Sequence, residues 1–258
     1  MAKGPGAYMD RLINRRAERI WQRAADAAPT LDLDTLRRMR GRARALRRQI
    51  DRFLHLAEGR LALPLIDSNA IVTPPGTDWA WRPAPWRGPL PAPGIAAAST
   101  GSAIGEGATL FHDCQFSELT LRQIRNTRKS DLAPFGLRLD VFRFDGSFLS
   151  LVIDLPGETI HTLRRRHLVR VDLSVTTEQP LEMFARLNVR HGPNTDRIVR
   201  EFPMDQDTDQ MVEFDLAYSK INEKRIEHAW IDLIVEGPQM NQIILHDITV
   251  SRRPRAEI

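Results

Sequence analysis

The stretch HAWIDLIVEGPQMNQIILHDITV, residues 228–250, decides the fold class of this chain. Apolar and polar side chains alternate on both sides of Gly237 and Pro238, which predicts two half-buried strands joined by a turn. Eight further runs of this kind begin at Ala108, and turn signals such as Asp145-Gly146 separate them. About ten short strands without a long helical pattern between them indicate an antiparallel β-sandwich over residues 108–258.

The closing strands also carry a resemblance to a known fold. Residues 213–216 (EFDL), 229–236 (AWIDLIVE) and 244–250 (ILHDITV) look like the last strands of a galactose-binding-like jelly roll. This resemblance implies a carbohydrate-binding-type β-sandwich over roughly residues 108–253. The whole chain also resembles an uncharacterised bacterial family, which implies no activity. Families with this sandwich include glycan binders, assembly factors and interaction modules, so the fold alone does not select a function.

Residues 1–60 differ from the rest of the chain in charge. They hold 15 Lys and Arg side chains against 7 Asp and Glu, whereas the whole chain has a net charge of only +4. This asymmetry favours an anionic partner for the segment, although only 4 lysines accompany 33 arginines, which is also typical of a biased genomic base composition.

The same residues predict an α-helical hairpin in front of the sandwich. In the first helix, residues 8–28, the apolar side chains fall on one side, and Arg11, Arg15, Arg19 and Arg23 lie opposite. A seam of apolar residues in 4,3 alternation from Leu36 to Ala57 predicts a second helix. Asp32 or Asp34 can cap its start, and Gly59 can end it.

Each predicted helix has an apolar stripe that needs a partner. The stripes can pack on each other, on the sandwich, in a homo-oligomer formed through residues 8–58, or on an anionic membrane surface. Helix 1 is the better candidate for membrane binding, because Trp21 lies at the edge of its apolar side and the four arginines lie on the opposite side. Nucleic acid is disfavoured as a partner, since no recognised fold or basic–aromatic array accompanies the charge.

We expect a cytoplasmic protein, peripheral at the membrane if helix 1 binds lipid. Residues 1–16 have no apolar run typical of a signal peptide, and no eighteen consecutive residues are apolar. The single cysteine, Cys114, excludes an internal disulfide.

Residues 61–107 predict a Pro-, Trp- and Gly-rich linker. Seven prolines lie between Ala70 and Pro93, and Trp79, Trp81 and Trp86 lie among them. Because proline lacks an amide donor, we expect neither a helix nor a central strand here. The tryptophans either form a surface on which a ligand stacks or hold the linker against the sandwich.

Two further groups of residues are candidate sites. Arg190, His191 and Asn194 lie in a polar segment that we expect to be a loop at one end of the sandwich, although turn chemistry also explains the Gly and Pro there. The pairs His112-Asp113 and His246-Asp247 form a polar cluster if the first and last strands are neighbours, and are otherwise ordinary strand residues.

No catalytic residue, metal site or cofactor is predicted, because the histidines lack ligand spacing and no nucleotide motif is present. The leading interpretation is a non-catalytic binding or assembly protein, in which the sandwich recognises a glycan or protein surface and the hairpin oligomerises or docks. One alternative is a glycan-active enzyme with a concave pocket of paired carboxylates, one with a raised pKa. Another is a membrane-surface adaptor acting through helix 1.

Overall fold

The computed structural model describes residues 5–62, 71–204 and 209–255, apart from the side chains at 5–14, 51–52, 55–56 and 58–62. The chain divides into two compact units, Met1–Leu54 and His55–Ile258. The first is helical, and the second contains the β-sandwich.

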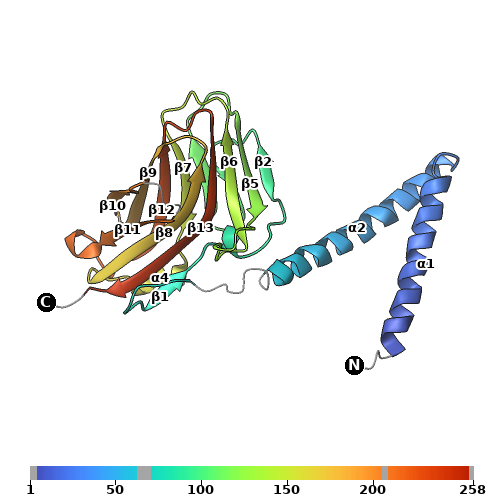
Figure 1. Cartoon of the computed structure of the whole chain (residues 1–258), viewed down its shortest axis with the longest axis horizontal. Coiled ribbons are helices and arrows are strands. Elements are labelled where there is room, and N and C mark those ends of the chain that lie inside the picture. Colours follow the sequence, from blue (N-terminus) through green and yellow to red (C-terminus); the bar gives the residue numbers. More distant parts are fainter. Residues whose placement is uncertain (1–4, 63–70, 205–208, 256–258) are drawn as a thin grey trace. The chain divides into compact units, whose positions relative to one another are not determined.

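The sandwich consists of two antiparallel sheets (Figure 1). Within the described residues, sheet A runs in the order β11 (Asp209–Asp215), β8 (His167–Thr177), β13 (Asn241–Pro254), β6 (Phe135–Val141), β5 (Leu119–Arg125) and β2 (Gly94–Ala96), and β1 (Trp79–Trp81) also pairs with β13. Sheet B runs in the order β10 (Asn194–Glu201), β9 (Glu182–His191), β12 (Ile226–Glu236), β7 (Leu149–Asp154), β4 (Ala108–His112) and β3 (Ser102–Ala103). The predicted mainly β fold and its ten strands from Ala108 onward are confirmed.

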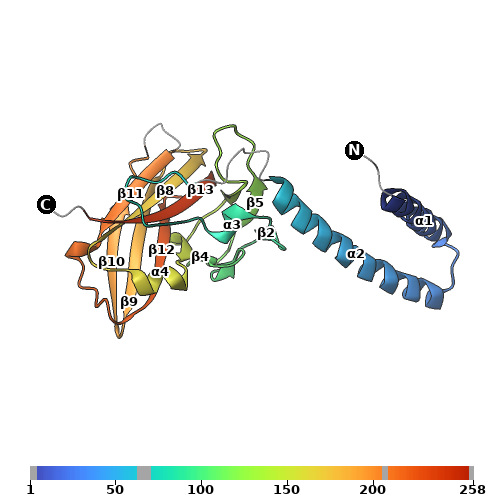
Figure 2. The same ribbon diagram turned by 90° about the horizontal axis from the view of Figure 1, so that it is seen from below.

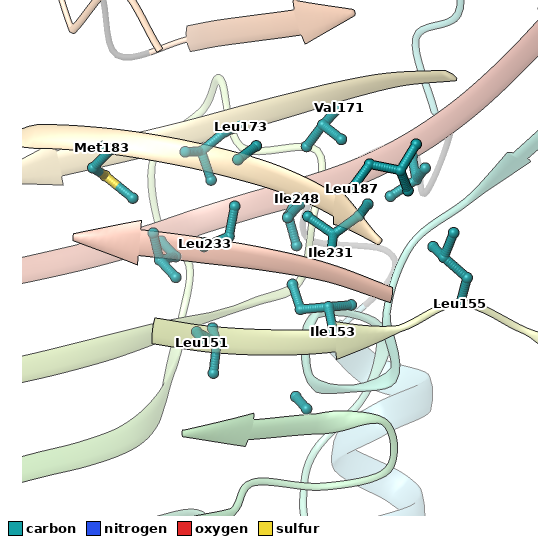
Figure 3. Packing of buried hydrophobic residues seen from close by; sticks show 14 of the residues in the cluster. Leu151, Ile153, Leu155, Val171, Leu173, Met183, Leu187, Ile231, Leu233 and Ile248 are labelled. Carbon is teal, nitrogen blue, oxygen red and sulfur yellow. The ribbon is translucent and has the colours of Figure 1, made fainter. Parts of the chain in front are cut away.

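The core lies between the inner faces of the two sheets. Ile153 of β7 and Ile231 of β12 point inward from sheet B, and Val171 of β8 and Ile248 of β13 point inward from sheet A (Figure 3). All four are fully buried. Burial of each such side chain stabilises the fold by about 1.5–3 kcal/mol, which is why alternating residues on these strands are apolar.

The described part of the predicted linker, residues 71–107, belongs to the sandwich. It contributes β1 and β2 to sheet A, β3 to sheet B and the short helix α3 (Ala84–Arg87), which lies beside β5 (Figure 2). The prediction of a separate linker was therefore wrong for these residues, whereas residues 63–70 lie outside the description. The expectation that prolines exclude a helix here was also wrong, because Pro85 lies in the first turn of α3, where a missing amide donor has no cost. The strands β1 and β2 are three residues long and contain no proline.

The helical unit contains α1 (Pro5–Ala27) and the part of α2 (Leu33–Ala62) up to Leu54. As expected, Asp32 caps α2, since its Oδ1 accepts a hydrogen bond from the amide of Thr35 at 2.9 Å. The predicted end at Gly59 is wrong, because the helix continues through it to Ala62. A glycine inside a helix costs only about 1 kcal/mol relative to alanine, so one glycine does not end a long helix.

Near the turn between the helices, Trp21, Ala24, Leu36 and Met39 are half-buried. Farther along α2 the large residues of the apolar seam, Leu46, Ile50 and Phe53, are exposed. Two smaller helical segments, α4 (Gly157–Thr162) and a 3₁₀ turn (Leu216–Tyr218), complete the described secondary structure.

Candidate functional site

An open groove of about 660 Å³ crosses the outer face of sheet A. It runs over β2, β5, β6 and the start of β13, with an edge at the turn that follows β8. Its lining residues are Gly94, Ile95, Ala96, Thr120, Arg122, Arg138, Asp140, Val141, Phe142, Glu178, Met240, Asn241 and Gln242. A volume of this size can hold a small-molecule ligand or part of an oligomer.

Strand register places the floor of the groove in one row of side chains. Thr120 of β5 pairs with Asp140 of β6, and Asp140 pairs in turn with Gln242 of β13. Ala96 of the edge strand β2 pairs with Thr120 on the other side. Side chains in directly paired positions lie on the same face of a sheet, so the row forms a continuous polar floor that ends at a small residue.

Asp140 is the centre of this floor. Its carboxylate accepts hydrogen bonds from Arg138 Nε at 2.7 Å, Gln242 Nε2 at 3.0 Å and Thr120 Oγ1 at 3.1 Å. Although burial acts to raise it, the pKa of Asp140 is lowered by the hydrogen bonds from Arg138 and Thr120. Asp140 is therefore ionised at neutral pH, and it orients the donors around it.

The remaining polar groups of the groove project from its rim. The side chain of Arg122 is half exposed, with its Nε 4.0 Å from Asp140. Glu178 lines the opposite side, where the buried Asn241 accepts hydrogen bonds from the amides of Glu178 and Gln179. Asn241 thus holds the turn that carries Glu178. The rim offers a guanidinium donor on one side and a carboxylate acceptor on the other.

One end of the groove is apolar. Phe142 is 53% exposed and Met240 is 67% exposed, and the amide of Met240 donates to the carbonyl of Phe142 at 3.1 Å. Met240 has a φ of 52°, in the left-handed region that costs a residue with a side chain about 1–2 kcal/mol. The fold therefore exposes two large apolar side chains beside the polar floor, one of them on a strained backbone.

A second hollow, of about 300 Å³, lies elsewhere on sheet A and has a different chemistry. Its lining includes Asp131, Asp172, Asp209 and Asp247, and burial raises the pKa of Asp247. Such a group of carboxylates is what we expected of an enzyme.

Three of these four carboxylates are paired with arginine. Asp247 binds Arg82 through both oxygens at 2.8 Å. Asp131 binds Arg128, and Asp172 binds Arg170. The Arg82–Asp247 pair joins a loop to β13, whereas the other two pairs lie within one loop and within β8. Because these carboxylates are neutralised by arginines of the fold itself, a structural role is favoured for the second hollow.

The tryptophans predicted as a ligand surface have separate positions. Trp86 is fully buried, and its Nε1 donates to the carbonyl of Leu245 at 2.9 Å, so it is inaccessible to a ligand and its assignment as a binding residue is corrected. Trp79 and Trp81 are half-buried and pack against the core, with stacked rings 6.4 Å apart. This arrangement matches the other interpretation, in which the tryptophans hold the segment on the sandwich.

Arg190, His191 and Asn194 do not form an open loop. Arg190 and His191 end β9, Asn194 begins β10, and Gly192 with a φ of 61° makes the tight turn between them. Arg190 is ion-paired with Glu227 at 3.0 Å, and the buried His191 contacts Asp196 at 3.4 Å. Turn chemistry therefore explains this segment, and the loop prediction was wrong.

His112, Asp113, His246 and Asp247 do not form the predicted polar cluster. The strands β4 and β13 belong to different sheets, so the expectation that they are neighbours was wrong. His112 contacts the carbonyl of Ala98, and Asp113 accepts from Ser147. A register shift between Leu245 and Asp247 places Asp247 toward Arg82, while the buried His246 contacts Thr176.

The predicted docking residues lie on α1. Arg15, Arg19 and Arg23 are exposed and Trp21 is half-buried, while the side chain of Arg11 lies outside the description. No described helix is both long enough and apolar enough to cross a bilayer. Among the residues that the structure describes, no group of three or more His, Cys, Asp or Glu side chains is arranged to hold a metal ion.

Sequence reasoning missed the groove, although one signal was available. Arg138, Asp140 and Phe142 are spaced two residues apart, so their side chains lie on the same face of the sheet. An aromatic residue on this otherwise polar face was the available signal. Arg122, Glu178 and Gln242 carried no such signal, because only the pairing of distant strands brings them together.

Solved structures similar to this chain include sandwich domains that bind carbohydrate. A family 11 carbohydrate-binding module from Clostridium thermocellum, in complex with a mixed-linked tetrasaccharide, is 9% identical over 65% of this chain and 99% of the module, with a TM-score of 0.35. The CBM22-1 xylan-binding domain of Paenibacillus barcinonensis Xyn10C is 9% identical over 62% of this chain and all of the domain, with a TM-score of 0.37.

A third similar structure is a larger protein, the enzymatically active domain of tailspike protein 4 from bacteriophage CBA120. It is 12% identical, with a TM-score of 0.40, and the match covers 60% of this chain but only 21% of the tailspike chain. All three likenesses are distant, so no inference about the groove rests on them.

Sequence comparison places the chain in a family. No curated protein matches it. The family model described as "Family of unknown function (DUF6478)" matches residues 1–258, so the chain belongs to this family over its whole length.

Proposed function

We propose that the sandwich is a glycan-binding domain and that an oligosaccharide binds in the groove over β2, β5, β6 and β13. The groove itself is the observation that carries this proposal. It combines an ordered polar floor around Asp140 with the exposed ring of Phe142 at one end.

The chemistry of the groove suits sugar rings. Each sugar hydroxyl both donates and accepts hydrogen bonds, and the groove offers donors on Arg122 and Gln242 beside the acceptor Glu178. The C–H faces of a sugar ring are apolar and can stack on Phe142. Small residues at Gly94 and Ala96 keep the β2 side of the groove open.

Replacement of Arg122 by alanine is expected to weaken glycan binding about tenfold or more, because it removes the exposed guanidinium at the rim. A glycan array would identify a ligand of the intact protein, and affinity electrophoresis in that glycan would compare the variants. Arg190→Ala is a matched control. Arg190 is about as exposed as Arg122 and also lies beside a carboxylate, but it belongs to sheet B, away from the groove. The proposal fails if no glycan is retained, or if both variants lose binding equally.

Replacement of Met240 by glycine separates binding from folding. The left-handed backbone at Met240 suits glycine, so the melting temperature should not fall, while the loss of an exposed apolar side chain should weaken glycan binding several-fold. Thermal unfolding and titration calorimetry of the same sample would check both expectations. A large drop in melting temperature, or unchanged affinity, would contradict this role for Met240.

The glycan-active enzyme remains the alternative interpretation. Its specific support is the group of carboxylates in the second hollow. Incubation of the protein with the glycan it retains, followed by measurement of new reducing ends, distinguishes the two functions. A binding domain leaves the glycan intact.

A further inference from the structure

Among the described side chains of the helical unit, the largest group of neighbouring exposed apolar residues lies on α2. Leu46, Ile50 and Phe53 are 41%, 49% and 68% exposed, and Leu54 beside them is also exposed. Apart from the sequence neighbours Phe53 and Leu54, these side chains are three, four, seven or eight positions apart, so they lie on one side of the helix. Together they form a continuous apolar surface, here called the α2 stripe.

Arginines border the α2 stripe on both sides. At 100° per residue, Arg42 and Arg47 lie about 70° to either side of its axis. Both are exposed, and residues 36–54 hold eight arginines against one acidic residue, Asp51. A partner that covers the stripe must therefore also accept positive charge on both sides of it.

This charge argues against a second copy of the chain as that partner. In a parallel coiled coil with Leu36 at the a position, Arg42 at g faces Arg47 at e of the other helix. In an antiparallel pair of α2 helices, the borders of the two stripes also meet without an acidic residue over residues 37–49. Like charges at both borders oppose self-association, whereas an anionic surface is complementary to them.

We propose that α2, through residues 42–54, lies on the surface of an anionic phospholipid bilayer. In this arrangement the α2 stripe enters the boundary between headgroups and acyl chains, while Arg42 and Arg47 extend to the phosphates. The helix lies in the plane of the membrane, in keeping with the finding that no described helix can span it.

The proposal assigns lipid contact to the second helix rather than to the first. On α1, Trp21 is half-buried beside the turn, and the Nε of Arg19 donates to the carbonyl of Arg15 at 3.1 Å. Among the described side chains, α1 exposes one large apolar residue, Ile20, whereas α2 exposes a group of four together with the bordering arginines. This inference does not depend on the glycan groove.

Sedimentation of the intact protein with lipid vesicles tests the proposal. The protein should sediment with vesicles that contain phosphatidylglycerol and remain in solution with pure phosphatidylcholine vesicles, and added salt should weaken the binding. Absence of binding to the anionic vesicles, or equal binding to both kinds, would overturn the proposal.

Two matched pairs of variants locate the contact. Arg42→Gln with Arg47→Gln should weaken vesicle binding about tenfold or more, because each arginine near an anionic surface contributes to binding. Arg44→Gln with Arg48→Gln removes the same charge from the opposite side of α2 and should have a much smaller effect. Equal effects of the two pairs would show attraction by net charge alone and would overturn the proposed orientation.

A third variant distinguishes lipid from a second copy of the chain. Leu46→Ser with Ile50→Ser removes apolar surface from an exposed position and should abolish sedimentation with anionic vesicles, while circular dichroism shows unchanged helix content. Light scattering should give a monomeric mass for the wild type without lipid. A dimer that this variant converts to a monomer would assign the α2 stripe to self-association and overturn the proposal.

Discussion

Replacement of Arg82 by alanine is expected to lower the free energy of unfolding by about 3–5 kcal/mol. Arg82 has 2% of its side chain exposed and binds both oxygens of Asp247, which is 16% exposed. The variant leaves a buried carboxylate without its guanidinium partner, and this cost greatly exceeds the loss of a surface ion pair. Urea unfolding at neutral pH would measure the difference.

The destabilisation should depend on pH in a direction that identifies Asp247. Burial raises the pKa of Asp247, and Arg82 opposes this effect. Without Arg82, the pKa of Asp247 in the folded protein lies farther above its value in the unfolded chain. The Arg82→Ala protein therefore loses stability as the pH rises through the folded-state pKa of Asp247, and it regains stability as the pH falls toward about 4.

Two controls make the Arg82 experiment specific. Arg190→Ala breaks an exposed ion pair and should cost less than about 1 kcal/mol. Arg82→Leu combined with Asp247→Leu removes both charges together and should recover most of the stability. An Arg82→Ala protein that unfolds at the same urea concentration as Arg190→Ala would show that the buried pair does not stabilise the fold.

Replacement of Trp86 by alanine is expected to cost about 3–5 kcal/mol, because Trp86 is fully buried and the substitution leaves a cavity. It also removes the hydrogen bond to the carbonyl of Leu245 in β13. Helix α3, which carries Trp86, is also held by Gln123, whose Nε2 donates to the carbonyls of Pro85 and Gly88 at 2.6 and 2.8 Å. Differential scanning calorimetry would measure the loss.

Trp86→Phe separates the two contributions of this side chain. Phenylalanine retains most of the apolar volume but leaves the Leu245 carbonyl without its donor, so a cost of about 1–3 kcal/mol is expected. Trp79→Ala is a useful comparison, since Trp79 is only half-buried. If Trp79→Ala destabilises the protein more than Trp86→Ala, the interpretation of Trp86 as a core residue is wrong.

Together these two predictions concern the Pro- and Trp-rich segment that the sequence suggested was a linker. Arg82 and Trp86 connect it to Asp247 and Leu245, both on β13. The segment is part of the sandwich because its side chains reach buried partners about 160 positions away, on the order of the length of a whole domain. Local composition contains no information about such contacts.

The sequence by itself determined the sandwich and the helices. The alternation in residues such as Ile231 and Leu233 is a local property, because successive side chains on a strand point to opposite faces whichever strand lies beside them. The cap at Asp32 is equally local, since its hydrogen bond spans three residues.

The tertiary structure alone decided which strands are neighbours, and with them the candidate site. Thr120, Asp140 and Gln242 meet only because β5, β6 and β13 pair in one register, and His112 and His246 are separated because their strands belong to different sheets. Many pairings bury the same alternating faces equally well. The choice among them depends on packing and buried contacts across the whole fold, which no local pattern of residues records.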